Sequence, residues 1–406
     1  MSIQKVSVFL NQSKSKQKVG TLLLKDRTIY FEYDSIFLKS KIELSPYKLP
    51  LKSGVHICEE SFFDGLFGVF DDSLPDGWGK LLLDRHLMSK GIQHRDISAL
   101  DRLSYIGEYG IGALSYEPIF ENIHLTDETI ILDDLAISSQ NILKGTSQEL
   151  LDTLLAIGGS SAGARPKAMI QIDKDDNIIH GSQILQNGYE HYIVKFPSSL
   201  DNPNIGKLEY IYSLMAKDAN IDIPTTKLLK GKENSYFAIK RFDRIKDERV
   251  HIHSAAALVH SNFRMPTLDY DDLLSLTLHL TKDIKECEKM FRLAAFNLFT
   301  HNRDDHGKNF SYLLDSKNNW KLSPAYDLTF SYGPGGEHST TYLGNGKNPT
   351  LLELNKLAQK HNIKNSKYII EEIKDTVSRF KDYAKDVELP KNYTDDIFKS
   401  FYKNNK

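Results

Sequence analysis

The sequence predicts an α+β fold with a β-rich N-terminal subdomain and a mainly helical C-terminal lobe. Three observations predict it. Short apolar runs broken by polar turns fill residues 6–116, strands followed by an amphipathic helix come next, and helical periodicity dominates from residue 270 onward. The chain of 406 residues exceeds the usual size of one domain, so we expect two or three compact units.

The N-terminal unit is predicted to cover residues 1–118. Its strands are "VSVFL", "GTLLL" and "IYFEY", and a glycine-rich strand in "GEYGIGALSYEP" closes it. One helix is expected in "LPDGWGKLLLDRHLMSKG", where Pro75 and Asp76 mark the start and Gly91 the end. A second helix is expected near Asp96 to Ile106.

The middle unit is predicted to cover residues 119–243, and it begins with a polar, acidic segment to about Gln148 that we expect to be a linker. The stretches "LLAIGGSSAGARPKAMIQID", "NIIHG" and "HYIVKFP" predict a loop, a strand, a turn over Asp173 to Asn177, and a strand. "SYFAIKRFDR" predicts a buried strand. Between them lies a helix with apolar residues on one face: Leu208, Ile211, Tyr212, Met215 and Ala219.

The C-terminal unit is predicted to cover residues 244–406. Its clearest helices are "DDLLSLTLHL" and "CEKMFRLAAFNLFT". Two strands follow, "NFSYLL" and "NWKLS", joined by the turn "DSKNN". A glycine-rich loop then leads into amphipathic helices that extend through Phe401, and no internal repeat is present.

Composition gives no sign of a nucleic-acid or membrane partner for the chain as a whole, although a local basic patch stays open. Lys and Arg (52) nearly balance Asp and Glu (54), so the whole chain has no net attraction to nucleic acid or to a membrane surface. No stretch approaches the roughly 20 apolar residues of a membrane helix. With only two cysteines, Cys58 and Cys287, and no targeting segment, we expect a reduced, cytoplasmic protein in which both cysteines are simply buried.

The segment "HNRDDHGKNF" gathers five charged or imidazole side chains between His301 and His306. One interpretation is a solvated polar loop after a helix. A second is a metal hydrolase that uses His301, Asp305 and His306, although the nearest upstream histidine, His279, is too far away to complete a helical ligand pair.

A third interpretation is phosphoryl transfer. In protein kinases a catalytic Asp precedes a metal-binding Asn by five residues, and a second metal-binding Asp follows two short strands. Asp304 and Asn309 have this spacing, a predicted hairpin follows, and Asp327 ends it in "SPAYDLT". Asp304 is suited to accept a hydroxyl proton, whereas Asn309 and Asp327 offer the oxygen ligands that Mg²⁺ prefers.

The middle unit contains the other parts that such a site needs. "GGSSAGARPK" offers small residues that can approach phosphates, but it is not a Walker A loop. Lys195 in "YIVKFP" is the candidate for reaching ATP phosphates, and Glu209 is its possible partner, as in the kinase Lys–Glu pair. The backbone of Lys240 to Phe242 is the candidate hinge for adenine.

Taken together, these residues resemble the HipA family of serine/threonine kinase toxins from bacterial toxin–antitoxin systems. The resemblance covers most of the chain, through "FFDGLF", "LPDGWGKLLLDR" and "IGEYGIGAL", followed by "AGARPKA", "YIVKFP", "RFDR", "DDHGKNFS" and "LSPAYDL" in family order. It implies a bilobal, protein-kinase-like fold of the HipA and phosphoinositide-kinase type.

The resemblance also implies roles for individual residues. Asp304 would be the catalytic base, Asn309 and Asp327 the Mg²⁺ ligands, and Ser160 or Ser161 the autophosphorylated residue that switches the enzyme off by expelling the phosphate loop. ATP would be bound by Ala162, Gly163, Ala164, Arg165, Pro166, Lys167, Lys195, Lys240, Arg241, Phe242, His306, Gly307, Lys308, Asn309, Tyr326 and Asp327.

The expected partners follow from the same resemblance. They are a HipB-like helix-turn-helix antitoxin, DNA mainly through that antitoxin, and a protein substrate, which in relatives includes glutamyl-tRNA synthetase; no membrane is expected. Lys240 stands where some relatives have an acid, which a backbone contact to adenine tolerates. Two alternatives stay open: a noncatalytic pseudokinase that regulates an antitoxin–DNA complex, and a small-molecule phosphotransferase.

Overall fold

A five-stranded antiparallel sheet forms the N-terminal unit, in the order β4-β3-β2-β1-β5. Its strands are β1 (Lys5–Gln12), β2 (Ser15–Lys25), β3 (Thr28–Tyr33), β4 (Val55–Ile57) and β5 (Leu114–Glu117). This computed structural model describes residues 3–12, 15–60, 62–119, 131–144, 154–155, 158, 165–180, 184–199, 201–232, 234–265 and 267–403. Alternate side chains of β1, among them Val6 and Val8, are fully buried, as the apolar alternation predicts.

Three helices connect β4 to β5: α1 (Gly68–Asp71), α2 (Gly77–Ser89) and α3 (Ala99–Ile106). Helices α1 and α3 contribute to the core of this sheet, whereas the buried apolar residues of α2 belong to a different core. The predicted helix after Pro75 is α2, whereas the second predicted helix begins later than expected. A separate 3₁₀ turn (His94–Asp96) comes before it, and Ser98 starts α3 with a capping box to Asp101.

The second sheet has the order β7-β6-β8-β10-β9 and is entirely antiparallel. Its strands are β6 (Lys167–Asp173), β7 (Ile178–His180), β8 (Tyr189–Lys195), β9 (Thr226–Lys230) and β10 (Ser235–Lys240). The predicted turn between β6 and β7 is confirmed, because the Asp173 carboxylate accepts hydrogen bonds from the backbone N–H groups of Asp175 and Asn177.

Helix α4 (Leu132–Lys144) corrects the prediction of a linker to about Gln148. Its apolar residues, including Leu135 and Ile142, join a core with α2 and the second sheet. The polar and acidic residues of this segment made its amphipathic pattern hard to recognise, and packing of the apolar face stabilises the helix. On the opposite face of this sheet lies α6 (Ile205–Asp218), the predicted helix.

The C-terminal lobe consists mainly of helices, as predicted. They are α7 (Ala255–Val259), α8 (Tyr270–Thr281), α9 (Ile284–Phe299), α10 (Leu351–Lys360), α11 (Ser366–Ser378), α12 (Phe380–Asp386) and α13 (Lys391–Lys403). Helix α9 carries the predicted buried stripe of Phe291, Ala294, Ala295, Leu298 and Phe299. None of the helices in the described ranges is both long and apolar enough to cross a bilayer.

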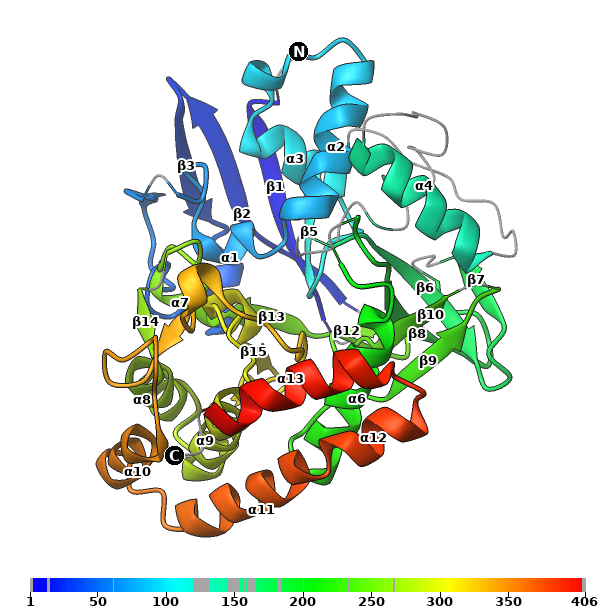
Figure 1. The fold of residues 1–406 in the computed structure, drawn as a ribbon. Helices are drawn as coiled ribbons and strands as arrows, with labels where there is room; N and C mark the ends of the chain where they lie inside the picture. Colours follow the sequence, from blue (N-terminus) through cyan, green and yellow to red (C-terminus); the bar gives the residue numbers. More distant parts are fainter. Residues whose placement is uncertain are drawn as a thin grey trace.

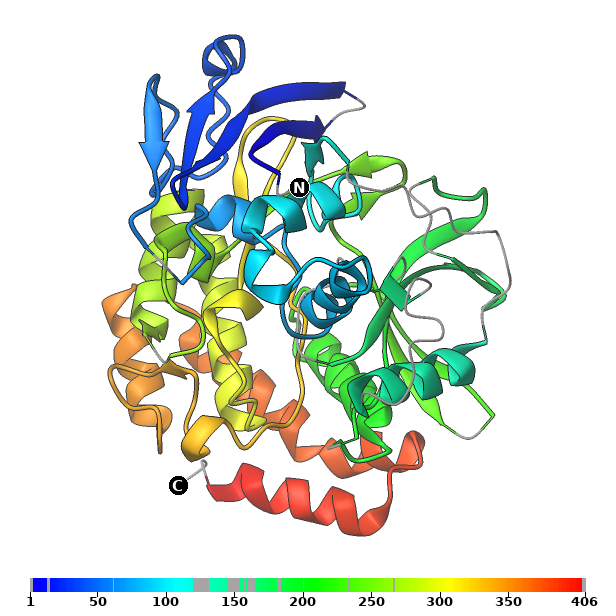
Figure 2. The same ribbon diagram turned by 90° about the horizontal axis from the view of Figure 1, so that it is seen from above.

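The predicted hairpin of this lobe, β15 (Ser311–Leu314) and β16 (Trp320–Leu322), gains a third strand, β13 (His251–Ser254). Two small sheets add β11 (Arg244–Ile245) with β12 (Glu248–Arg249), and β14 (Leu268–Asp269) with β17 (Thr340–Thr341). Figures 1 and 2 show the two large sheets on either side of α2, with the C-terminal helices packed beneath them.

The apolar cores link the units. One core lies under the N-terminal sheet but includes Ala257 and Leu314 of the C-terminal lobe, and another combines Trp78 of α2 with the second sheet. The α+β class is confirmed, while the exact division at residues 118 and 243 stays a prediction.

Candidate nucleotide-binding and catalytic site

A cavity of about 330 Å³ lies where the N-terminal unit, the second sheet and the C-terminal lobe meet. Its size is within the usual range of small-molecule sites. Most of the predicted site residues in the described ranges line it: Lys167, Lys195, Lys240, Arg241, Phe242, Asp304, His306, Lys308, Asn309, Tyr326 and Asp327. Residues of three segments far apart in the sequence therefore converge on one space.

Lys195 lies at the centre of the charged end of this cavity. Strand β8 ends at Lys195, and its ammonium group donates to Glu209 Oε1 of α6 at 2.7 Å and also bonds to Asp327 Oδ1. Arg165 reaches the same Glu209 oxygen at 3.3 Å. Glu209 does not line the cavity and is only 2% exposed, so it anchors the two cations from behind.

The charges of this group favour an ionised site. Burial would raise the pKa of Asp327, but the charges of Lys195 and Lys167 outweigh it and hold this pKa below its ordinary value. Burial would lower the pKa of Lys195, but Asp327 and Glu209 raise it. Lys167 is 7% exposed, and burial lowers its pKa. Asp327 is therefore a carboxylate, able to bind a cation, and Lys195 carries a positive charge.

The segment after α9 places the proposed base beside this group. The side chain of Asp304 is 54% exposed, and His306 Nε2 lies 4.0 Å from its Oδ1 atom. The cavity walls desolvate Asp304 and raise its pKa, His306 opposes this shift, and the charge of Asp327 adds to it. A carboxylate with a raised pKa is a better proton acceptor than an ordinary one.

Asn309 is oriented by the same loop. Its side-chain amide donates to the Asp304 carbonyl at 2.7 Å, which leaves Oδ1 as the atom that can bind a metal ion. His306 has a buried ring atom, Nδ1, with no partner among the described residues, and such an atom requires a polar ligand or water. Gly307 is buried against Leu268 and Ala256 and does not line the cavity.

Two further members of the cluster, Asp305 and His301, face away from the cavity. Asp305 is 1% exposed and accepts hydrogen bonds from Tyr270, His338, Ser339 and Thr340. His301 bonds through Nδ1 to the Ser331 carbonyl and stacks on Phe330. The metal-hydrolase hypothesis is therefore wrong, because these side chains share no site with His306.

The predicted hinge is shaped by backbone pairing. Lys240 N–H donates to the Thr225 carbonyl, and Arg241 N–H donates to the His191 carbonyl. The Lys240 ammonium turns outward to Glu190, so only the backbone of Lys240 is left for an adenine contact. The Arg241 side chain is held by Asp243, at 2.8 and 2.9 Å.

The N-terminal unit contributes residues that the sequence analysis missed. Asp72, Leu74, Asp76 and Ile111 line the cavity, together with Ile193, Ile239, Asp243, Ile252, Ser254 and Ser311 from the other units. Lys308 does not extend freely toward a ligand, because its ammonium bonds to Asp71 at 2.9 Å and lies 3.9 Å from Asp76. The acids in "FDDSLPDG" were the available signal, but nothing in their local spacing connects them to residue 308.

Other predicted residues lie outside the described ranges or behind the site. Ser160, Ser161, Ala162, Gly163 and Ala164 belong to the first group. Pro166 does not line the cavity, and its carbonyl accepts from the Phe196 N–H instead. Tyr326 donates to the Lys308 carbonyl at 2.6 Å and packs on Phe242 with ring centroids 5.6 Å apart, which connects hinge and catalytic loop.

The donor set fits a nucleotide with a hard divalent cation. Isoleucines 111, 193, 239 and 252 supply apolar walls of the kind that a purine requires, and cations and carboxylates lie together at the end that contains Lys195. Asn309 and Asp327 offer amide and carboxylate oxygens, the ligand type preferred by Mg²⁺.

Comparison with protein-family models matches residues 7–117 to the HipA N-terminal domain and residues 159–383 to the HipA-like C-terminal domain. The chain belongs to the HipA family. In fold, this HipA-family protein is similar to HipA of Shewanella oneidensis MR-1, solved in complex with HipB and operator DNA. The TM-score is 0.69, at 18% identity over 98% of this chain and 94% of that one.

Two bacterial relatives are each named "Putative kinase". The one from Haemophilus influenzae is 26% identical over 51% of this chain and 62% of its own length. The one from Sinorhizobium fredii, Y4dM, is 27% identical over 47% of this chain and 50% of its own length. The HipA-family chain thus spans only one half to three fifths of the curated relatives it matches.

Proposed function

We propose that this protein is an ATP- and Mg²⁺-dependent serine/threonine protein kinase that acts as a growth-arresting toxin. The observation that carries the proposal is the ion-pair group in which Lys195 joins Glu209 and Asp327 in the cavity that also holds Asp304 and Asn309. This is the set of charges that phosphoryl transfer requires. Membership of the HipA family and relatives named as kinases support it.

The residues divide the work as follows. Lys195 and Lys167 bind phosphate oxygens, and the backbone of Lys240 to Phe242 contacts the adenine. Asn309 and Asp327 would hold Mg²⁺, which neutralises charge on the phosphates when bound. Asp304 orients the attacking hydroxyl and accepts its proton.

The Lys195–Asp327 contact has a consequence for binding. Once nucleotide and metal are present, the Lys195 ammonium would bind phosphate oxygens and the Asp327 carboxylate would bind the cation. The bond between them therefore has to open, while the bond from Lys195 to Glu209 is kept. Glu209 is thus the residue that holds Lys195 in position throughout the cycle.

Regulation and partners follow the family. The known complex of the Shewanella oneidensis HipA with HipB and operator DNA supports a HipB-like helix-turn-helix antitoxin for this chain and DNA binding mainly through it. We further propose a protein target, with an aminoacyl-tRNA synthetase such as glutamyl-tRNA synthetase as the first to test. Autophosphorylation at Ser160 or Ser161, next to the phosphate loop, would switch the enzyme off.

The test is phosphorylation by purified protein given ATP and Mg²⁺. We expect phosphate on Ser160 or Ser161 and on a protein in whole lysate, and none with Asp304→Ala. A protein that binds ATP but transfers no phosphate supports the pseudokinase alternative. Transfer to small alcohols in place of lysate protein supports the small-molecule phosphotransferase.

A further inference from the structure

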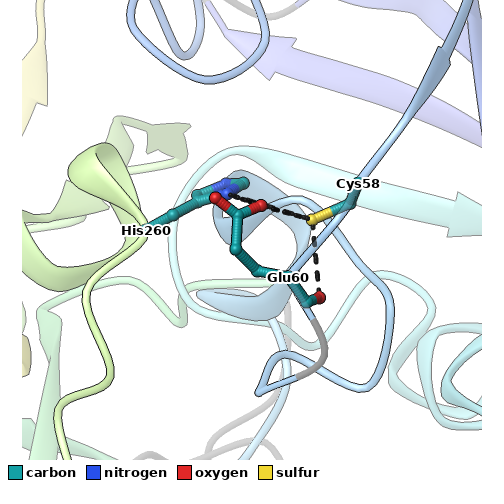
Figure 3. Close-up of side chains that lie close together, drawn as sticks. All are labelled: Cys58, Glu60 and His260. Atoms are coloured by element: carbon teal, nitrogen blue, oxygen red, sulfur yellow. Dashed lines mark hydrogen bonds and ion pairs between the residues drawn. The ribbon is translucent and has the colours of Figure 1, made fainter.

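Figure 3 shows a second cluster of reactive side chains, Cys58, Glu60 and His260, at the boundary between the N-terminal unit and the C-terminal lobe. None of the three lines the cavity. Cys58 and Glu60 follow β4, and His260 follows α7. In the described ranges this is the one group of three His, Cys, Asp or Glu residues whose donor atoms all lie within 4.8 Å of one another. The expectation that both cysteines are buried holds for Cys287 but not for Cys58, which is half-buried.

The distances between donor atoms suit a tetrahedral metal ion. His260 Nδ1 lies 2.9 Å from Glu60 Oε2, and Cys58 Sγ lies 3.4 Å from the same oxygen and 3.9 Å from the nitrogen. Typical zinc bond lengths to sulfur, nitrogen and oxygen place tetrahedral donors roughly 3.4 to 3.6 Å apart. Shifts of about half an ångström would therefore bring all three side chains onto one ion.

The surroundings hold the imidazole and leave the site accessible. The side chain of His260 is 1% exposed and lies between Phe63 and Phe67, with ring centroids 5.4 and 6.1 Å away. The side chain of Glu60 is 30% exposed. A rigid ligand at the inside and an accessible carboxylate at the outside would let an ion enter from solvent without unfolding.

We propose that Cys58, Glu60 and His260 bind a transition-metal ion of the zinc class across this boundary, with the fourth coordination position open to water. The combination of a thiol, an imidazole and a carboxylate selects Zn²⁺ or Co²⁺ over Mg²⁺. The site is chemically distinct from the oxygen-only pair Asn309 and Asp327, so it does not depend on the proposed kinase function.

Hydrogen bonding and protons have to rearrange when the ion binds. The Gly68 N–H donates to His260 Nε2 at 3.0 Å, so in the metal-free protein the ring proton is on Nδ1 and is donated to Glu60. An ion at Nδ1 moves this proton to Nε2 and breaks the bond to Gly68, which is the first residue of α1. The Cys58 thiol loses its proton to solvent when its sulfur binds the ion as a thiolate, while Lys48 contacts the other oxygen of Glu60, Oε1.

Two consequences follow from this rearrangement. One proton is released for each ion bound, because the imidazole only exchanges its tautomer while the thiol ionises, so binding weakens in acid. The Gly68 amide at the N-terminus of α1 loses its hydrogen-bond acceptor, so this amide should exchange with solvent faster when the site is filled.

The test uses the full chain, stripped with a chelator under reducing conditions and titrated with Co²⁺ alone. We expect one equivalent to bind, with a thiolate-to-cobalt charge-transfer band that Zn²⁺ removes by displacement. Cys58→Ser should abolish the band, Glu60→Gln should weaken binding while keeping an acceptor for His260, and Cys287→Ser, the matched control, should bind as the unaltered protein does.

The outcomes decide the proposal. A folded protein without the band, or a band that survives Cys58→Ser and disappears in Cys287→Ser, overturns it. Hydrogen exchange of a peptide covering α1 gives the second measurement: exchange that saturating Zn²⁺ does not accelerate rules out coordination by His260 Nδ1. None of these readouts requires kinase activity, so failure here and failure of the proposed function are distinguishable.

Discussion

The loop of residues 301–306 has two faces whose side chains differ sharply in burial and hydrogen bonding. In the sequence, the adjacent acids Asp304 and Asp305 look alike. On the cavity side, the carboxylate of Asp304 is half exposed, and the Nδ1 atom of its neighbour His306 has no partner among the described residues. On the protein side, Asp305 accepts four hydrogen bonds and is almost completely buried. The difference teaches that the number of protein donors around an acid, and not its position in a motif, decides whether it is free to act on a ligand.

The largest expected effect tests the cavity side. We expect Asp304→Asn to lower the rate of phosphoryl transfer by about 10² to 10⁴-fold, the usual contribution of a general base, while the melting temperature stays nearly unchanged. The measurement is kcat for autophosphorylation beside a thermal melt. If Asp304→Asn is inactive only because it has unfolded, then Asp304 stabilises the fold as Asp305 does, and the proposed difference between the two faces is wrong.

The second effect tests the protein side. Asp305→Ala leaves the buried donors of Tyr270, His338, Ser339 and Thr340 without their acceptor, so we expect the free energy of unfolding to fall by about 3 to 5 kcal/mol. Urea unfolding measures it, with Asp304→Ala as the matched control. A similar loss of unfolding free energy in Asp304→Ala and Asp305→Ala would contradict the proposal that only Asp305 is needed for the fold.

The third effect concerns an anchor that lies behind the cavity but acts on it. Glu209→Gln weakens the hold on Lys195, and a hydrogen bond to a charged group contributes about 1.5 to 3 kcal/mol, so we expect ATP affinity to fall by about 10 to 100-fold. Calorimetric titration with ATP measures it. Unchanged affinity would show that Asp327 alone positions Lys195.

The smallest effect concerns the dependence of folding stability on pH, which buried histidines such as His301 control. Burial lowers the pKa of His191, His251 and His301 to about 4. Because the unfolded chain binds these protons first, stability is complete above pH 6.5 and falls as the pH drops from about 6.5 toward 4. His301→Gln should flatten the dependence of unfolding free energy on pH in this window; an identical slope in the variant contradicts the assignment.

The pH dependence of catalysis should differ from that of stability. The pKa of Asp304 is raised, so the fraction of active base increases with pH and the rate should rise through a pKa above the ordinary aspartate value of about 3.9. Rates measured from pH 4 to 7 on protein that remains folded test this. A rate that is flat to pH 4 would mean that Asp304 does not titrate in the working range.

Many strands and helices of this molecule could be predicted because their patterns lie within a few neighbouring residues of the sequence. The strands of the N-terminal unit follow from alternation, and the hairpin β15–β16 and the helices α6 and α9 follow from periodicity and turn residues. Asp304, Asn309 and Asp327 line one cavity, since the hairpin between Asn309 and Asp327 returns the chain to its start; their roles in catalysis and metal binding stay predictions.

The features that could not be predicted depend on contacts between residues that are far apart in the sequence. Asp71 meets Lys308 across 237 positions, and Glu60 meets His260 across 200, and no spacing rule connects such pairs. Helix α4 was missed because its polar face and acidic neighbours dominated the segment, although its apolar face is buried against α2 and the second sheet. These contacts attach the N-terminal unit to the rest of the molecule.

The most direct test of the central claim measures ATP binding and phosphoryl transfer separately in the unaltered protein, Asp304→Asn and Asp327→Asn. We predict that Asp304→Asn still binds ATP in the presence of Mg²⁺ but transfers phosphate about 10² to 10⁴-fold more slowly, whereas Asp327→Asn loses the Mg²⁺-dependent part of binding. Transfer by Asp304→Asn at the rate of the unaltered protein, or no ATP binding by the folded unaltered protein, would contradict it.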